Sequence, residues 1–290
     1  MTVDPPDLPA GPDSGQGSGR ERRERIRQLV ITEGFVRIDT LAQELGVSPM
    51  TIHRDLQKLE SRGWLRKVRG GATSRPSTLF HGDVLHRSAT MATAKREVTE
   101  AVRELLAPGR SVILDESTTA LHLVGSLPSY APLTVITNSL TVVAAVAREP
   151  GIDLIALGGT YFPAYDAFLG MQTVNAVGAL RADLLFMSTT AVTNDRCFHQ
   201  SLETVQVKRA LMAAAAYTVL LLDHTKFSKV GLHELARLAD FDLVVVDSQT
   251  DPDAVEQLRR RAVQVRVAPA LPAESLPGER AESLAADRTG

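Results

Sequence analysis

The chain has 290 residues, which suits one large or two medium domains, and its 44% hydrophobic and 23% charged residues are ordinary for a soluble globular protein. No stretch approaches the roughly 18 uninterrupted apolar residues of a membrane span, and the N-terminus lacks the basic-then-apolar layout of a secretory signal. Cys197 is the only cysteine, which excludes an intrachain disulfide and a cysteine-based metal cluster. We therefore expect a cytoplasmic protein with no membrane partner, no metal and no cofactor.

The net charge of −2 is unevenly distributed along the chain. Residues 20–75 hold 13 Lys and Arg against 7 Asp and Glu, whereas residues 76–290 hold 19 against 24. A compact basic segment on an otherwise acidic chain is typical of a nucleic-acid contact surface. On charge alone, a merely solvated basic face is an equally good interpretation.

The basic segment has the pattern of a small helical unit. Residues 1–19 are rich in Pro, Gly, Ser and Asp, so we expect them to be disordered. Apolar residues at helical spacing then predict helices over 22–32, 39–45 and from after Ser48 to about Arg62. The segment 63–72, Gly-Trp-Leu-Arg-Lys-Val-Arg-Gly-Gly-Ala, suits a two-stranded wing.

Residues 41–56 have the sequence pattern of a helix-turn-helix. Ala42 is small where two helices would cross closely, and Gly46 lies at the turn, where a positive φ is needed. Ser48 can cap the next helix, and Pro49 takes its first position, where a missing N–H costs nothing. The second helix of this motif is the one that enters the major groove.

That second helix has two different faces. Ile52, Leu56 and Leu59 recur at steps of four and three and form one buried stripe. The opposite face is polar and basic, as a helix that reads base edges and phosphates requires, and the basic wing could reach the backbone or the minor groove. The predicted DNA-binding residues are Ser48, Met50, Thr51, His53, Arg54, Gln57, Lys58, Arg66, Lys67 and Arg69. The alternative is an ordinary helical hairpin. The helix cap, the glycine turn, the basic helix face and the basic wing all occur together, however, and this combination favours a domain that binds double-stranded operator DNA.

From about Phe80, short β-branched runs alternate with helical patterns such as 94–106, 139–147 and 202–216. Strands that alternate with helices predict a mostly parallel, buried sheet. The expected strands are 111–114, 133–136, 153–157, 184–188, 218–222, 243–246 and 263–267. The fold class is therefore α/β, with an N-terminal winged helix-turn-helix followed by a mostly parallel α/β sensor domain.

Polar residues follow several of these strands and predict a ligand site, because open α/β sheets bind ligands outside the carboxyl ends of their strands. Hydroxyls at 117–119 lead into a helix and favour an anion such as phosphate, Lys226 could add a charged contact, and Asp115 could accept sugar hydroxyls. The predicted effector-binding residues are Asp115, Ser117, Thr118, Thr119, Asn138, Gly158, Gly159 and Lys226. Each signal alone has a plainer interpretation as a helix cap, a tight turn or a loop lysine.

Cys197 and His199 are near one another in sequence, but no third partner completes a catalytic or metal set, so we interpret them as structural or ligand-facing. Glu203 and Lys208 lie on one helix, and their plainer interpretation is a solvated pair. The tail from Pro269 has the composition of a disordered segment. The predicted parts are a disordered N-terminus, a DNA-binding domain, a linker, a sensor domain and a disordered tail, at 1–19, 20–75, 76–79, 80–268 and 269–290.

Residues 51–56, Leu59-Glu60, Gly63 and 68–72 closely resemble the winged helix-turn-helix of DeoR-type regulators, with His53 where the family usually has Arg. The resemblance continues to about residue 250 and includes Lys95, the loop 115–119 with Ser117 in place of the common Gly, 137–139, 157–159, Gly170, Asp183 and 223–227. It implies a sensor domain similar to the sugar-phosphate isomerase fold, related to ribose-5-phosphate isomerase. It also implies an effector that is a phosphorylated sugar or a derivative.

Three function classes follow. The leading one is a DNA-binding transcription factor, a repressor by family habit, which acts as a homo-oligomer and responds to a phosphorylated sugar. The second is an isomerase-like enzyme, against which no acid/base carboxylate pair can be placed. The third is a constitutive DNA-binding protein with a degenerate sensor, which the departure at Ser117 favours. We expect the first and no enzyme activity.

Overall fold

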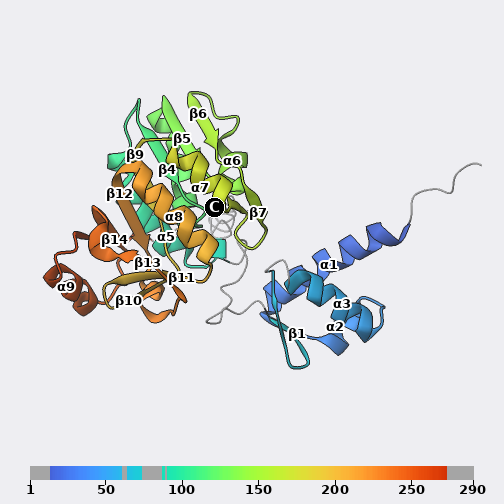
Figure 1. Cartoon of the computed structure of the whole chain (residues 1–290). Coiled ribbons are helices and arrows are strands. Elements are labelled where there is room, and N and C mark those ends of the chain that lie inside the picture. Colours follow the sequence, from blue (N-terminus) through green and yellow to red (C-terminus); the bar gives the residue numbers. More distant parts are fainter. Residues whose placement is uncertain (1–13, 61–63, 74–86, 89, 273–290) are drawn as a thin grey trace, which may run out of the picture.

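A computed structural model describes residues 14–60, 64–73, 87–88 and 90–272 (Figure 1). The elements before residue 74 are α1 (Ser14–Glu33), β1 (Phe35–Arg37), α2 (Ile38–Glu44), α3 (Pro49–Glu60), β2 (Arg66–Val68) and β3 (Gly71–Thr73). The three strands form an antiparallel sheet in the order β1-β3-β2. The three predicted helices and the wing are thus present as a winged helix-turn-helix.

Two predictions for this domain are corrected. Helix α1 begins at Ser14, so residues 14–19 are helical rather than disordered, whereas residues 1–13 lie outside the described part. The wing has a third strand, β1, which three residues are too few to signal by periodicity. The predicted linker at 76–79, and residues 61–63 at the predicted end of the third helix, also lie outside the described residues.

One hydrophobic core joins the helices to the small sheet. Ile26 and Val30 of α1, Leu41 of α2, and Ile52 and Leu56 of α3 are all buried in it. These positions recur every three or four residues, because a helix that lies on a core buries one stripe of its surface. The predicted buried stripe of the recognition helix is therefore confirmed.

The seven strands expected after residue 80 form one parallel sheet in the order β15-β14-β12-β9-β4-β5-β6. They are β4 (Ser111–Leu114), β5 (Leu133–Thr137), β6 (Ile152–Ala156), β9 (Ala182–Met187), β12 (Ala215–Leu222), β14 (Leu243–Val246) and β15 (Val265–Val267). The predicted α/β class, with a parallel sheet covered by helices, is confirmed.

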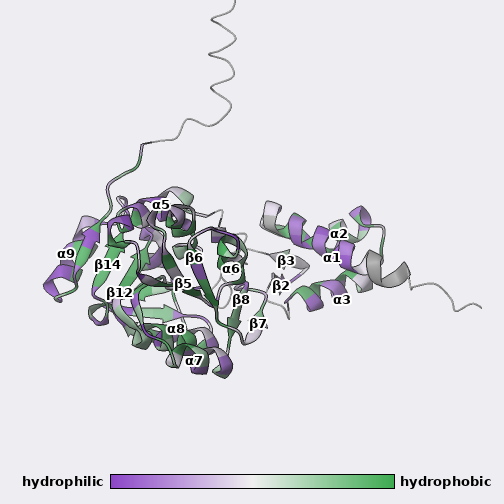
Figure 2. Ribbon diagram, turned by 90° about the horizontal axis from the view of Figure 1, so that it is seen from above, coloured by the Kyte–Doolittle hydropathy of each residue, from purple (hydrophilic) through white to green (hydrophobic). Residues whose placement is uncertain are grey.

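Helices cover both faces of this sheet (Figure 2). One face packs against α5 (Ala92–Glu100), α6 (Leu140–Val146) and the 3-10 helices η1 (Arg103–Leu105) and η2 (Ala120–Tyr130). The other packs against α7 (Met171–Gly178), α8 (Leu202–Ala214) and α9 (Pro252–Arg260). Successive residues of a strand point to opposite faces, so Ile113 lies in one core and Val112 and Leu114 in the other.

Several short elements were not predicted. A hairpin, β7 (Thr160–Phe162) with β8 (Ala167–Leu169), and a small sheet of β10 (Ala191–Thr193), β11 (Arg196–His199) and β13 (His233–Arg237) flank the main sheet, together with η3 (His224–Ser228) and η4 (Leu238–Asp240). The predicted tail begins too early, because the backbone N–H of Leu271 donates to Glu97 Oε1 at 3.4 Å. Residues 273–290 lie outside the described part.

Candidate functional site

The recognition helix α3 is held at its start by the predicted cap and turn. Gly46 has a φ of 64°, which suits a residue without a side chain. The hydroxyl of Ser48 accepts the N–H of Thr51 at 3.2 Å, and Pro49 is the first helical residue. These contacts fix the angle at which α3 leaves the turn.

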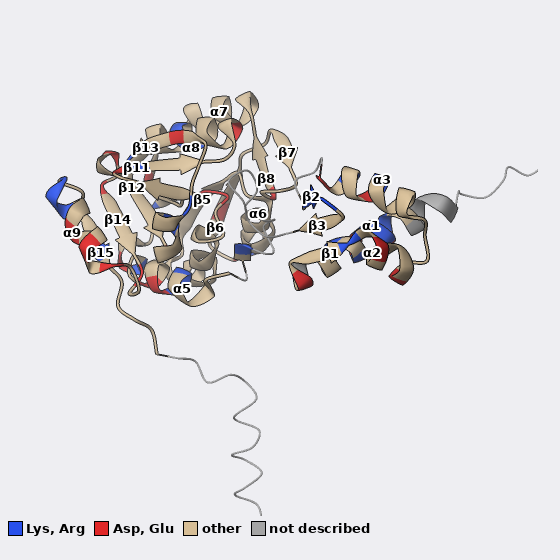
Figure 3. Ribbon diagram, turned by 90° about the horizontal axis from the view of Figure 1, so that it is seen from below, with Lys and Arg blue, Asp and Glu red and all other residues tan. Residues whose placement is uncertain are grey.

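The outward face of α3 carries the predicted DNA-binding side chains. Met50 is 62% exposed, His53, Arg54, Gln57 and Lys58 are exposed, and Thr51 is half-buried. In the wing, Arg66 and Arg69 are exposed and Lys67 is half-buried. Figure 3 shows Lys and Arg along α1 and on β2 as well. The arrangement offers a polar, basic surface of the kind that duplex DNA requires.

Asp55 forms a contact behind this surface that the sequence did not reveal. It lies on the buried side of α3, where its carboxylate accepts Arg22 Nε at 2.6 Å and Arg23 Nη1 at 3.3 Å. The two arginines of α1 neutralise the acid, so the recognition helix keeps a basic outer face. Its position three residues after Ile52, on the apolar stripe, is the signal that could have identified it.

Two glycines allow the wing to fold back on α3. Gly70 makes the hairpin with a φ of 77°, and a Cβ at Gly71 would lie 2.4 Å from the carbonyl oxygen of Val36. The backbone N–H of Lys67 donates to Glu60 Oε1 at 2.7 Å, which ties β2 to the end of the recognition helix. The motif Val68-Arg69-Gly70-Gly71-Ala72 therefore has a geometric basis.

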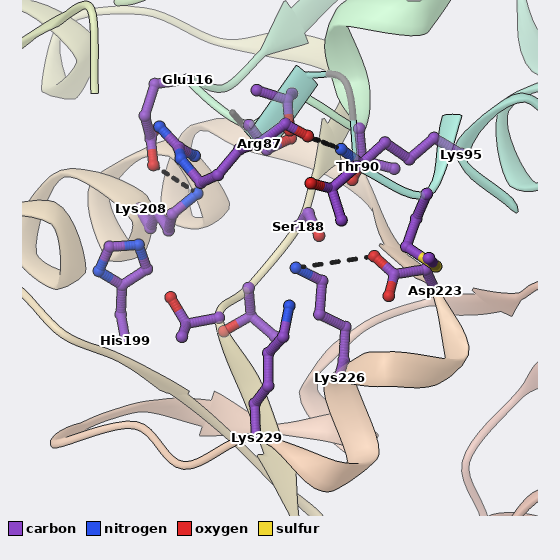
Figure 4. Close-up of a pocket in the computed structure, with 16 residues that line it drawn as sticks. Arg87, Thr90, Lys95, Glu116, Ser188, His199, Lys208, Asp223, Lys226 and Lys229 are labelled. Carbon is purple, nitrogen blue, oxygen red and sulfur yellow. Dashed lines mark hydrogen bonds and ion pairs between the residues drawn. The ribbon is translucent and has the colours of Figure 1, made fainter. Parts of the chain in front are cut away.

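A pocket opens at the carboxyl ends of β4, β9 and β12, three adjacent strands at the centre of the sheet (Figure 4). The loops after these strands supply most of its wall, and α5, α8, β11 and the residues just before α5 supply the rest. It is lined by Arg87, Thr90, Met91, Lys95, Glu116, Ser117, Thr118, Thr119, Ser188, Thr189, Thr190, His199, Lys208, Asp223, Lys226 and Lys229. Four of the predicted effector-binding residues are therefore brought together, namely Ser117, Thr118, Thr119 and Lys226.

Cations outnumber acids in this wall. Lys95 donates to Thr118 Oγ1 at 3.0 Å and to the carbonyl oxygen of Arg87, and Lys226 lies 3.7 Å from Asp223. Burial and the charge of Lys226 lower the pKa of Lys95 to about 7. Burial, opposed by Asp223, lowers the pKa of Lys226 to about 8. A bound anion would stabilise the charged form of both lysines and raise both pKa values again. The wall is therefore suited to a negatively charged ligand.

Beneath the pocket, Lys208 forms a buried ion pair rather than the predicted solvated pair with Glu203. Its ammonium, 1% exposed, contacts Asp115 Oδ2 and lies 2.8 Å from Glu116 Oε1. Although burial disfavours its charge, the two carboxylates raise the pKa of Lys208 above its usual value. Asp115 also accepts the backbone N–H groups of Ser117 at 2.9 Å and Ser188 at 3.0 Å. It thereby fixes the loop after β4 instead of lining the pocket.

The other three predicted effector-binding residues lie outside the pocket wall. Asn138 exchanges hydrogen bonds with the backbone of Phe168 in β8, at 3.1 and 2.8 Å. The carbonyl of Gly158 accepts the hydroxyl of Thr173 at 2.8 Å, and a Cβ at Gly159 would lie 2.1 Å from that hydroxyl oxygen. In the free protein these contacts hold the β7–β8 hairpin and α7 against the ends of β5 and β6.

Sequence reasoning missed several residues of the wall. Ser188, Thr189 and Thr190 come directly after a predicted strand, which is the same signal that identified 117–119. Lys95 was noted only as part of the family resemblance, whereas Arg87 and Lys229 carry no local pattern and enter the site only through the fold. His199 lines the pocket 5.5 Å from the ring of Tyr165, whereas Cys197 is buried, which raises the pKa of its thiol.

Within the described part of the chain, no group of His, Cys, Asp and Glu is placed to hold a metal ion. None of the helices formed by those residues has the length and apolar character needed to cross a bilayer.

Two family models match the chain. "DeoR-like helix-turn-helix domain" matches residues 22–78, and "DeoR C terminal sensor domain" matches residues 90–248, which is more than half of the chain. The first range holds most of α1 and every element from β1 to β3, and the second holds the elements from α5 to β14 with nearly all of the pocket wall.

Relatives cover nearly all of both domains. The "L-fucose operon activator" of Haemophilus influenzae is 30% identical over 81% of this chain and 94% of its own, and the "Glycerol-3-phosphate regulon repressor" of the same species is 29% identical over 76% and 86%. Ribose 5-phosphate isomerase A from Methanocaldococcus jannaschii, a solved structure, has a TM-score of 0.33 at 16% identity over 46% of this chain and 53% of that one, which is below the level of a shared fold. Both domain models describe parts of transcription regulators rather than enzymes. The chain therefore belongs to the DeoR family of DNA-binding transcription regulators.

Proposed function

We propose that this protein is a repressor whose affinity for operator DNA is set by a phosphorylated sugar, or a related metabolite, bound in the pocket of its sensor domain. The observation that supports this most is the composition of the pocket wall, in which cationic side chains outnumber acidic ones. The five cationic side chains are Arg87, Lys95, Lys208, Lys226 and Lys229, and the two acids are Glu116 and Asp223. Hydroxyls of Ser117, Thr118 and Thr119 stand beside them. Charge-assisted hydrogen bonds from such a set suit a phosphate.

The remaining polar wall suits the carbon chain of a sugar. Ser188, Thr189, Thr190 and His199 offer donors and acceptors without adding a fixed charge. The departure at Ser117 does not point to a degenerate sensor, because its Oγ accepts the N–H of Ala120 at 3.0 Å and the residue remains in the pocket wall. The names of the relatives, a glycerol-3-phosphate regulon repressor and an L-fucose operon activator, agree with control of carbohydrate genes.

On DNA, we propose that the exposed side chains of α3 read bases and that the wing contacts phosphates. Arg54 and Gln57 lie on the outer face at one-turn spacing and can reach base edges, while the flexible apolar Met50 can contact a thymine methyl group. We propose that the protein binds as a homo-oligomer, and that it acts in the cytoplasm, where an operator is accessible.

The test uses the full chain and a duplex selected by that chain from a random DNA library. Inorganic phosphate, glycerol 3-phosphate, ribose 5-phosphate and glucose 6-phosphate are added in gel-shift titrations. We expect at least one sugar phosphate to change the affinity for the duplex by about tenfold or more, because coupling energies of 1–3 kcal/mol are typical. A reporter behind the duplex should lose expression when the protein is supplied. Equal affinity with all of these compounds would contradict the proposed effector class.

A further inference from the structure

Glu116 has one carboxylate oxygen that the protein leaves without a partner. The residue follows β4, lines the pocket and is 4% exposed. Its Oε1 receives Lys208 Nζ at 2.8 Å, whereas Oε2 is buried and accepts no hydrogen bond from any described residue. Leaving a buried acceptor unpaired costs free energy, and such atoms in native proteins call for a partner supplied from elsewhere.

The ion pair below the pocket does not satisfy this oxygen. Lys208 serves Asp115 and Glu116 together, so one buried ammonium faces two buried carboxylates. Both oxygens of Asp115 already accept backbone N–H groups, from Ser117 and Ser188. This buried group therefore holds two carboxylates for one ammonium, and of the two acids Glu116 is the one that lines the pocket.

Glu116 stands away from most of the lysines (Figure 4). Glu116, Lys208 and His199 occupy one end of the pocket, and Lys95, Asp223, Lys226 and Lys229 occupy the other. Arg87 borders the first end, where its guanidinium donates to the carbonyl oxygen of Ala164 at 3.3 Å and lies 5.5 Å from the ring of Tyr165. A phosphate held at the lysine end would point the rest of a ligand toward Glu116.

We propose that Glu116 is a specificity-determining residue of the pocket, whose Oε2 accepts a hydrogen bond from a hydroxyl at the end of the effector remote from its phosphate. The pocket then selects sugar or alditol phosphates and rejects phosphorylated sugar acids. A carboxylate of the ligand at that end has no hydrogen to donate to Oε2 of Glu116, whereas a hydroxyl has one. This inference rests on the proposed function, because it presumes a phosphate at the lysine end.

The substitution Glu116→Gln tests the proposal with little change in shape. Lys208 carries only donors, so it will hold the amide oxygen at the position of Oε1. The amide NH₂ must then occupy the position of Oε2 and present a donor to the pocket. The variant therefore exchanges an acceptor for a donor at a single point and should favour a ligand that ends in a carboxylate.

The experiment is calorimetry on the full chain with two probes that differ only at one terminal carbon. Glucitol 6-phosphate ends in a primary alcohol and 6-phosphogluconate in a carboxylate, and inorganic phosphate probes the lysine end alone. We expect the wild type to bind the alditol about tenfold or more tightly than the acid, as a charged hydrogen bond would provide. In Glu116→Gln this ratio should fall by about tenfold or reverse, with phosphate affinity unchanged.

Glu203→Gln is the matched control, because Glu203 is an exposed carboxylate on α8 that does not line the pocket. It should keep the wild-type ratio. An unchanged ratio in Glu116→Gln, or equal wild-type affinities for alditol and acid, would overturn the specificity role. If the wild type bound none of the three probes, the proposed function itself would fail. Should Glu116→Gln not fold, Glu116→Asp retracts the same charge by one methylene and should weaken the alditol selectively.

Discussion

Lys95 is a buried cation whose ammonium is held by uncharged oxygens. It is 3% exposed and donates to the carbonyl of Arg87 and the hydroxyl of Thr118. A charge in such surroundings costs free energy, which explains why burial, with Lys226, lowers its pKa to about 7. In a ligand-free pocket the buried ammonium therefore lowers the stability of the folded protein, and a bound anion would offset this loss.

The lowered pKa of Lys95 predicts that the stability of the ligand-free protein depends on pH. The pKa of Lys95 falls from 10.5 in the unfolded chain to about 7, so between these values the unfolded chain binds more protons and stability rises with pH. The penalty is complete below pH 7. Lys95→Met should therefore raise the Tm relative to wild type most below pH 7, and the gain should shrink toward pH 9.5. A gain that is constant across this range in thermal scans would contradict the assignment.

We expect Arg54 to be the residue on which the reading of DNA depends most. It lies at the centre of the outer face of α3 and is exposed. Arg54→Ala should lose about 1–3 kcal/mol of specific binding, since one good base contact is worth that much. Gel-shift titration against the selected duplex measures the loss, with the far-ultraviolet circular dichroism unchanged. Undiminished affinity would mean that another face of the domain contacts the bases.

Lys226 should matter for the effector and not for DNA alone. Its ammonium is 15% exposed, borders the pocket and lies 3.7 Å from Asp223. Lys226→Ala should weaken sugar-phosphate binding by about ten- to hundredfold, as loss of a charge-assisted hydrogen bond implies. Operator affinity without ligand should stay the same. Calorimetry with glucose 6-phosphate and its unphosphorylated sugar should show that the substitution hardly affects the latter.

At the level of elements, the ion pairs of Asp55 connect the N-terminal helix to the recognition helix. Asp55 is buried, and its partners Arg22 and Arg23 on α1 are about one-fifth exposed. The contact fixes α1 across α3 without using any outward residue. We therefore expect a change in α1 to alter the position of the outer face of α3.

Asp55→Ala should destabilise the N-terminal domain by about 1–3 kcal/mol, because two guanidinium groups lose their buried acceptor. Trp64 is the only tryptophan of the chain and lies in this domain, under Arg27 at 3.3 Å, so its fluorescence in urea reports the domain selectively. Asp39→Ala, at an exposed position of α2, should leave the midpoint unchanged. Equal midpoints for Asp55→Ala and wild type would show that the ion pairs add nothing.

The sequence pattern predicted the long helices and the strands of the main sheet, whereas the short strands and part of the pocket wall depend on contacts between distant residues. Most of the seven strands of the parallel sheet are short β-branched or apolar runs that alternate with helical patterns along the chain, so each was predicted within a few residues. The three-residue strands β1, β7, β8 and β10 have no period to read. Loop positions 117–119 and 226 were predicted to share a site because strand ends meet at one edge, whereas Asn138 and Gly158 lie past the strands β5 and β6, outside the wall. Lys208 was misjudged because its partner Asp115 is 93 residues away in the sequence.

For the whole molecule, we expect self-association. A single recognition helix reads only a few base pairs, and two-fold symmetry doubles the contacts on a palindromic or repeated site. Light scattering should give at least twice the chain mass of 31.3 kDa, both in free solution and on the selected duplex. A mass of one chain in both conditions would contradict this expectation, and would leave a single winged helix to account for specific binding.

The ion pair between Asp115 and Lys208 has a consequence for how regulators of this kind diversify. It anchors the loop after β4 from beneath, through the contacts of Asp115 with Lys208 and with two backbone N–H groups. The side chain at 117 takes no part in these contacts, so we expect a duplicated gene to accept a new residue there without loosening the sheet or the DNA-binding domain. Such an exchange would present a different wall to a different nutrient while the operator stayed the same.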